Sequence, residues 1–367
     1  MAGLTAAEKA EALEALRIAG NNATEAARSL GMARSTFRNR LASAQIDPAI
    51  EESMEAVGTN MVPQLAWAKT KSKDGTSYSV LLKPAPDGDM ADRLRDVFDG
   101  ITAAPVVQAP RYSAPDLLAL YPIADAHIGM QAWGRETGED YDTETACARI
   151  REWMGRCVAS APAAETAIIL DTGDLLHADD QTNQTPRSKH ALDVDTRHFK
   201  TLDVTIAAMA AAIELALAKH KRVIVRILPG NHDMHSYMAV LFALAERYRD
   251  NPRIEVQKDP GEFFAYEFGK VLIAAHHGDK AKAERMVLFL ADQYPEIWGR
   301  TRHRFLWTGH LHHHKSADIG GVQWEQLRAI TAKDAYAVSH AYSARAQLQV
   351  ITYHRERGEI GRSKVAA

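Results

Sequence analysis

Cysteine is nearly absent from this chain of 367 residues, and long hydrophobic runs are missing. Cys147 and Cys157 are its two cysteines, and ten residues within one predicted helix hold them too far apart for a disulfide. We therefore expect reduced thiols and a cytoplasmic protein. The best apolar stretch, at 205–218, is broken by Glu214 and falls short of the ~20 residues that a membrane helix needs. We expect no membrane partner.

The chain also lacks an excess of either charge. Its 47 acidic and 44 basic residues give a formal net charge of −3, so nucleic-acid binding would require local basic patches. Hydrophobic residues make up 46% and charged residues 25%, which is typical of a soluble globular protein and excludes a wholly disordered one. Histidine, in contrast, is abundant, with sixteen residues, which directs attention to metal binding.

Three regions differ in their sequence pattern. We predict a small helical domain at 1–46, a hairpin and linker region at 47–116, and an α/β domain at 117–367. In the middle region, two strand patterns flank Lys73-Asp74-Gly75, which is typical of a hairpin. The aromatic and lysine side chains of this hairpin could form a nucleic-acid surface or could pack against a neighbour.

Residues 4–46 are predicted to form a compact helical unit. Thr5 can cap a first helix, with Glu8 at the capping-box position. Thr24 can cap a short second helix, and a third helix is expected at about 34–44. A helix, a glycine turn and a following helix are the parts of a helix-turn-helix.

The third predicted helix is basic. The stretch 26–46 holds four arginines and no acidic residue. Four polar side chains could point from this helix into a DNA major groove: Arg34, Ser35, Arg38 and Asn39. The segment 20–37 resembles the Fis-type helix-turn-helix, which implies that DNA is a partner. The alternative is a three-helix protein-interaction bundle with a solvated basic face.

From Leu117 onward, strand patterns alternate with helical ones. Five apolar runs, each ending in a polar cluster, lie at 117–124, 167–170, 223–228, 271–275 and 305–307. Helical patterns lie at 143–159, 201–219, 237–249 and 280–293. Buried strands that feed helices predict an α/β sandwich, and such folds bind ligands beyond the carboxyl ends of their strands. The polar clusters should therefore converge, although Pro122 is awkward for a central strand.

The clusters hold carboxylate, imidazole and amide groups and no thiolate. This donor set suits Mn²⁺, Fe²⁺ or Zn²⁺. The clusters together offer seven such ligands, which is more than one metal ion binds, so two ions that share a bridging carboxylate are expected. Two cations about 3.5–4 Å apart can bind a bridging hydroxide and clamp a phosphate for in-line attack. The sequence therefore predicts a site that can bind two metal ions and, through them, a phosphate.

Taken in order, the clusters resemble the signature of the calcineurin-like metallophosphoesterases, over roughly 120–360. The motifs are Asp125-x-His127, Gly173-Asp174, Gly230-Asn231-His232-Asp233, His276-His277-Gly278 and Gly309-His310-x-His312. The resemblance implies an αββα sandwich that binds two divalent ions, with Mn²⁺ favoured over Fe²⁺ or Zn²⁺. Relatives in this family commonly dimerise, so a homodimer is possible.

The resemblance also implies a role for each residue. The implied ligands of one ion are Asp125, His127 and His312; those of the other are Asn231 and His310, with Asp174 bridging both. The remaining ligand would be His277, with His276 as the alternative. His232 would be the general acid or the transition-state stabiliser, oriented by Asp233.

The substrate is indicated by two further similarities. The stretches Asp125-Ala-His-Ile-Gly and Gly173-Asp-Leu-Leu-His177 are similar to motifs of double-strand-break-repair nucleases in this superfamily. The layout, a DNA-binding-like region followed by this domain, resembles phosphoesterases of bacteriophages and prophages. We therefore expect a DNA nuclease. A long loop at 178–200 could grip the substrate or be a solvated excursion.

Two alternatives remain open. One is a small-molecule or cyclic-nucleotide phosphoesterase whose amino-terminal domain serves assembly only. The other is a DNA-binding regulator with a catalytically idle domain, against which the intact ligand set argues.

Overall fold

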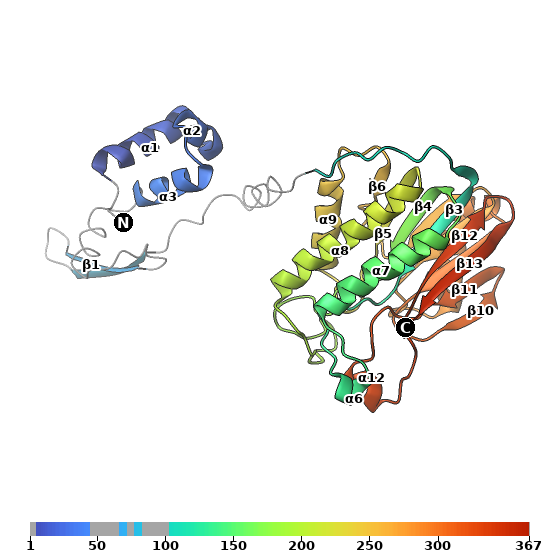
Figure 1. Cartoon of the computed structure of the whole chain (residues 1–367). Coiled ribbons are helices and arrows are strands. Elements are labelled where there is room, and N and C mark those ends of the chain that lie inside the picture. Colours follow the sequence, from blue (N-terminus) through green and yellow to red (C-terminus); the bar gives the residue numbers. More distant parts are fainter. Residues whose placement is uncertain (1–4, 45–65, 72–76, 83–102, 367) are drawn as a thin grey trace. The chain divides into compact units, whose positions relative to one another are not determined.

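The structure is a computed structural model that describes residues 5–44, 66–71, 77–82 and 103–366. The chain divides into two compact units, Met1–Arg93 and Leu94–Ala367 (Figure 1). The described part of the first unit contains three helices and a hairpin, and the second unit contains two sheets with their covering helices.

Three short helices form the first described segment, as predicted. Their core consists mostly of alanines around Phe37, which is fully buried. The predicted capping box is confirmed, because Thr5 accepts from the Glu8 N–H while the Glu8 carboxylate accepts from the Thr5 N–H. The helices are α1 (Ala6–Ile18), α2 (Ala23–Ser29) and α3 (Arg34–Ala44).

The cap of α2 differs from the prediction. Asn22, and not Thr24, is the capping residue, because its side-chain oxygen accepts the N–H groups of Thr24 and Glu25. Asparagine is among the preferred residues at this position, and the helix begins at Ala23, before the predicted cap. The hairpin is confirmed as an antiparallel pair of β1 (Ala66–Lys71) and β2 (Ser77–Leu82), and its turn lies outside the described residues.

Two sheets stack in the second unit. The six-stranded sheet has the order β13-β12-β3-β4-β5-β6, in which β3 to β6 are parallel. Its strands are β3 (Ala114–Ile123), β4 (Ala164–Asp171), β5 (Arg222–Ile227), β6 (Ile254–Val256), β12 (Gln347–His354) and β13 (Gly358–Ala366). The five-stranded sheet has the order β10-β11-β9-β8-β7. Its strands are β7 (Phe264–Phe268), β8 (Val271–Ala275), β9 (His303–Thr308), β10 (Lys315–Ile319) and β11 (Val322–Gln326).

Helices cover both outer faces. Three helices pack their apolar faces on the six-stranded sheet (Figure 1): α7 (Thr143–Ser160), α8 (His198–Lys219) and α9 (Tyr237–Arg247). The five-stranded sheet is covered by α10 (Ala283–Gln293) and α11 (Pro295–Arg300). Between the sheets lies a buried core of aliphatic and aromatic side chains from both. The αββα sandwich expected from the sequence is therefore confirmed.

The strand prediction succeeds even at Pro122. This proline lies in β3, between β12 and β4, as a central strand residue. Its missing N–H is tolerated because β12 pairs with β3 only over 117–120, so Pro122 lies beyond that ladder. The strand begins at Ala114, earlier than predicted.

One described helix, α8, is long and apolar enough to cross a membrane by length and composition alone. Half of its apolar window is buried, and it packs against α7, α9 and the sheet, as the core helix of a folded domain does. Both cysteines are buried free thiols in α7, as predicted.

Candidate metal centre

The predicted polar clusters converge at one edge of the sandwich. Each follows the carboxyl end of a strand, and the ends of parallel strands meet at the same edge. The residues that come together are Asp125 and His127 after β3, Asp174 after β4, Asn231 and His232 after β5, His277 after β8, and His310 and His312 after β9. The five strand ends thus bring every metal ligand implied by the resemblance to one place.

Five of these residues have an unusual backbone. Positive φ angles occur at Asp125 (48°), His127 (43°), Asp174 (57°), His310 (73°) and His312 (59°). A non-glycine residue in this region costs about 1–3 kcal/mol, and such strain clusters at functional sites. The backbone therefore bends sharply to aim these side chains at one another.

Two glycines of the motifs allow the carboxylates to approach the backbone closely. A Cβ at Gly230 would lie 2.0 Å from Oδ1 of Asp174. A Cβ at Gly309 would lie 2.6 Å from Oδ2 of Asp125. Any larger residue at either position would displace a carboxylate from the centre.

The first group of donors is Asp125, His127 and His312. The Nε2 atoms of His127 and His312 lie 3.1 Å apart, and Nε2 of His312 lies 3.6 Å from Oδ1 of Asp125. Ligands that hold one ion at about 2.0–2.2 Å lie roughly 3 Å from each other. This spacing fits a single divalent ion.

The second group is Asp174, His277 and His310, with Asn231 beside it. Nε2 of His277 lies 3.2 Å from Oδ2 of Asp174 and 3.0 Å from Oδ1 of Asn231. Nδ1 of His277 contacts the carbonyl of Thr172 at 2.9 Å, which fixes the ring with Nε2 toward the donors. This spacing also fits one divalent ion.

Asp174 faces both groups. Its Oδ2 atom lies 3.2 Å from Nε2 of His277 in the second group and 3.9 Å from Nε2 of His127 in the first. Its Oδ1 atom accepts the N–H of His232 at 2.7 Å, which holds the carboxylate in place. Asp174 is therefore placed to bridge the two groups.

Burial shapes the charge of the centre. Burial raises the pKa of Asp125 to about 7 and lowers the pKa of His312 to about 4. His127 is lowered well below its usual pKa, by burial and by His232, so these imidazoles are neutral, as metal binding requires. Burial opposes a charge on His277, but Asp174 and Asp125 raise its pKa to about 10. The buried carboxylates thus favour a cation at this position.

His276 lies outside the donor set. Its ring packs on Phe263, with centroids 4.5 Å apart, and its Nδ1 accepts the N–H of Gly278 at 2.9 Å. Consecutive side chains in extended backbone point in opposite directions, so only one of the two adjacent histidines faces the donors. The structure places His277 there.

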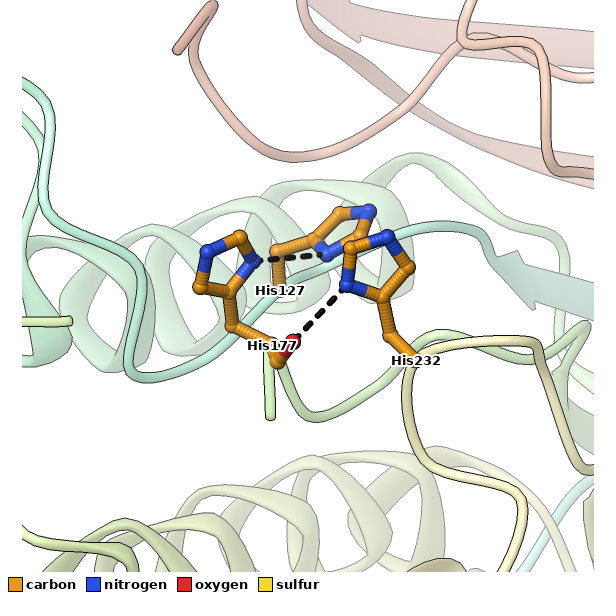
Figure 2. Close-up of side chains that lie close together, drawn as sticks. All are labelled: His127, His177 and His232. Atoms are coloured by element: carbon orange, nitrogen blue, oxygen red, sulfur yellow. Dashed lines mark hydrogen bonds between the residues drawn. The ribbon is translucent and has the colours of Figure 1, made fainter. Parts of the chain in front are cut away.

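A histidine that the sequence did not single out as a site residue completes the cluster. His177 lies with His127 and His232, and these three rings surround one point (Figure 2). The rings of His177 and His232 stack with centroids 5.3 Å apart, and Nδ1 of His177 contacts Nδ1 of His127 at 3.2 Å. The available signal was its position three residues after Asp174.

The predicted partnership of His232 and Asp233 is wrong. Nδ1 of His232 contacts the carbonyl oxygen of His177 at 2.8 Å (Figure 2), whereas Asp233 accepts the N–H groups of Leu176 and Gly230. Burial raises the pKa of Asp233 to about 7. The side chains of His232 and Asp233 point in different directions. Asp233 therefore connects the loops after β4 and β5 through its hydrogen bonds, whereas the carbonyl oxygen of His177 orients the ring of His232.

The centre opens into a cavity of about 940 Å³. Its walls include most of the donor residues, part of the 178–200 loop and much of the segment 328–346. Within that loop, Arg187 lies 3.8 Å from Asp279, and Asp179 pairs with His235. These contacts hold part of the loop against the rest of the unit, and His190, in another part of the loop, lines the cavity.

The predicted DNA contacts lie in the other unit. Arg34, Ser35, Arg38 and Asn39 all belong to α3, and the side chains of Ser35 and Asn39 lie outside the described residues. Arg40, on the same helix, pairs instead with Glu8 and Glu11 of α1.

The chain was compared with known proteins by sequence and by structure. No protein-family model matches the sequence, and no curated protein does. Among solved structures, a dimetal phosphatase from Danio rerio matches with 9% identity and a TM-score of 0.39, over 69% of this chain and 99% of that one. An archaeal phosphodiesterase matches with 13% identity and a TM-score of 0.36, over 68% and 99%. A predicted phosphoesterase from Streptococcus pneumoniae matches with 11% identity and a TM-score of 0.30, over 69% and 100%.

Such low identities and TM-scores assign neither a family nor a chemistry to this chain.

Proposed function

We propose that this protein is a two-metal phosphodiesterase that hydrolyses DNA. The observation that carries the proposal is the carboxylate of Asp174, which faces two separate groups of metal-type donors. When bound, two divalent ions would supply positive charge that polarises a phosphate and activates water. The donors are imidazole, carboxylate and amide oxygen, with no thiolate, and suit Mn²⁺, Fe²⁺ or Zn²⁺. The family resemblance favours Mn²⁺ among these.

The residues divide this work between them. Asp125, His127 and His312 would hold one ion, and Asn231, His277 and His310 the other, with Asp174 shared. His232 lines the same cavity, and its Nδ1 contacts the carbonyl oxygen of His177, which leaves Nε2 for the substrate. It would stabilise the charge that develops on the phosphate or donate a proton to the leaving group.

DNA as the substrate is supported by the amino-terminal unit. Its helix α3 carries Arg34 and Arg38 four residues apart, so both lie on one face. The resemblance of the whole layout to phage and prophage phosphoesterases favours the same substrate. A small-molecule phosphoesterase is the second candidate, favoured by the formal net charge of −3, which does not attract nucleic acid.

A substrate panel tests the proposal. The purified protein with Mn²⁺ is incubated with duplex DNA, single-stranded DNA, cyclic nucleotides and bis-p-nitrophenyl phosphate. We expect cleavage of DNA and of the small diester. Cleavage of cyclic nucleotides without cleavage of DNA would favour the second candidate, and no cleavage of any diester would refute a phosphodiesterase.

The role of α3 is tested separately. Replacing Arg34 and Arg38 with alanine should weaken duplex binding and lower the salt slope by about one for each phosphate that is no longer neutralised. Arg17→Ala is the matched control, because Arg17 lies on α1 and pairs with Glu14. Unchanged duplex affinity over a salt series would show that this unit serves assembly instead.

A further inference from the structure

We infer that the cavity beside the metal centre contains a binding site for a nucleotide with an unpaired base. The site is formed by the segment 328–346 together with His190. This inference rests on the proposed function, and it narrows the substrate from DNA in general to a single strand or a frayed end.

The cavity is larger than a phosphate requires. Its volume of about 940 Å³ lies near the top of the range of about 300–1,000 Å³ that is typical of ligand pockets. Most of the wall beyond the donors comes from the segment 328–346, which contains the short helix α12 (Ala335–Ser339). Helix α12 packs on α6 (Gly134–Thr137) at the side of the unit (Figure 1). The wall is therefore anchored and leaves room for a ligand group beside the phosphate.

Partly exposed aromatic rings line this wall. Tyr336 is 56% exposed and Tyr342 is 60% exposed, and both line the cavity. The ring of Tyr336 lies 4.1 Å from that of His340, and the rings of His340 and Tyr342 stack with centroids 5.9 Å apart. His190 approaches Tyr336 from the 178–200 loop, at 6.3 Å. Rings that served the core would be buried, whereas these form a stacking platform of the kind that binds nucleic-acid bases.

Three cations line the same wall. In the part of the chain that the structure describes, the side chains of Arg328, Lys333 and Arg345 make no hydrogen bond or ion pair. Arg362 of the same unit, in contrast, pairs with Glu325. One acidic residue of the wall, Asp334, is engaged as the cap of α12. The three cations are therefore available to phosphate oxygens.

Stacking rings, available cations and a phosphate-binding centre together match one ligand class. A nucleotide next to the scissile bond would place its base on Tyr336 or Tyr342 and its phosphate near the cations. In a duplex the base faces are already stacked inside the helix, so only an unpaired base can occupy the platform.

Tyrosine variants test the platform directly. Binding of a short single-stranded oligonucleotide is measured by fluorescence anisotropy in EDTA, where no hydrolysis occurs. The Tyr336→Leu, Tyr342→Leu double variant should raise the Kd about 5- to 100-fold, because each stacking ring that is removed weakens binding. The double phenylalanine variant keeps both rings and should bind nearly as well as wild type. Tyr112→Leu, an exposed tyrosine outside the cavity, is the matched control.

Affinity that is unchanged in the leucine variant would overturn the inference, as would an equal loss in the phenylalanine variant. A matched duplex should lose much less affinity than the single strand, and an equal loss would overturn the requirement for an unpaired base. Circular dichroism and the melting temperature establish that each variant is folded before its affinity is compared.

Charge variants test the cations. Lys333→Ala and Arg345→Ala should each lower the salt slope of single-strand binding by about 0.7 if the side chain contacts a phosphate. Arg111→Ala removes the same charge outside the cavity and serves as the control. An unchanged slope in both cavity variants would show that neither Lys333 nor Arg345 contacts a phosphate of the bound strand.

These measurements separate this inference from the proposed function. If the wild type binds single strands through the tyrosines but hydrolyses no diester, the proposed function fails and the nucleotide site stands. If it hydrolyses diesters while its affinity for single strands is independent of the tyrosines, the nucleotide site fails and the proposed function stands.

Discussion

The substitution Asp174→Asn tests the bridging position. Oδ2 of Asp174 lies 3.2 Å from His277 and 3.9 Å from His127, and Oδ1 accepts the N–H of His232. Asparagine keeps one oxygen, which we expect to retain the hydrogen bond from His232. Its amide nitrogen would then face both donor groups, and an NH₂ group cannot ligate a cation. Both ions would lose an anionic ligand at once.

The expected effect on turnover is large. Bound metal supplies several kcal/mol of transition-state stabilisation, and about 1.4 kcal/mol corresponds to tenfold in rate. Loss of even one ion should therefore slow hydrolysis of a small diester at least about 10³-fold. Metal analysis after gel filtration should show that most of the metal is lost. The melting temperature of the metal-free variant should match that of the metal-free wild type, while the increase caused by Mn²⁺ should disappear.

Asp193→Asn is the matched control, because Asp193 lines the same cavity but belongs to neither donor group. It should retain both ions. The reasoning would be refuted if Asp174→Asn bound two ions and turned over normally. A lower melting temperature of the metal-free variant would instead indicate that the substitution acts through folding.

Four further substitutions test other residues of the protein. His232→Ala should retain both ions and lose about 10²–10⁴ in rate, and loss of metal would show that His232 is a ligand. His277→Ala should lose an ion on metal analysis whereas His276→Ala should keep both, and equal retention would undo the choice between them. Burial lowers the pKa of His220 below the value of about 6.5 that it has in the unfolded chain. Neutral His220 therefore makes its full contribution to the free energy of unfolding above about pH 6.5, and this contribution is lost as the pH falls. His220→Leu leaves the hydroxyl of Tyr121 without its partner and should lower the free energy of unfolding in urea by about 1–3 kcal/mol at about pH 7.5. The difference between wild type and variant should narrow toward about pH 5, and a constant difference would contradict this pH dependence.

The convergence of the donors was predictable because it depends on topology. Strands that alternate with helices form parallel sheets, and parallel strands end at the same edge. A short apolar run such as 271–275 could be recognised from end to end, so the residues that follow it could be placed at that edge. The left-handed backbone at Asp125 and Asp174 could not be predicted from the hydrophobic pattern, because it arises from the requirement to aim the side chains at the metal centre.

The direction of side chains within the loops could not be predicted. Adjacent residues after a strand face different sides, and periodicity does not fix which side each faces. The sequence therefore left open which of His276 and His277 is the metal ligand. It also assigned Asp233 to His232 incorrectly and did not place His177 in the site.

The cavity wall was missed for another reason. The segment 328–346 shows no helical or strand period, and it approaches the metal centre only because the chain returns from β11 to β12 across the end of the sandwich. Such closeness between distant segments is a property of the tertiary fold alone.

The central claim is most directly tested by a metal titration of turnover. The protein is stripped with EDTA, dialysed, and assayed for hydrolysis of bis-p-nitrophenyl phosphate while Mn²⁺ is added in measured equivalents. Two ions that share Asp174 predict no turnover in the stripped protein and full turnover only when about two equivalents are bound. Full turnover after stripping, or saturation at a single bound equivalent, would contradict a two-metal phosphodiesterase.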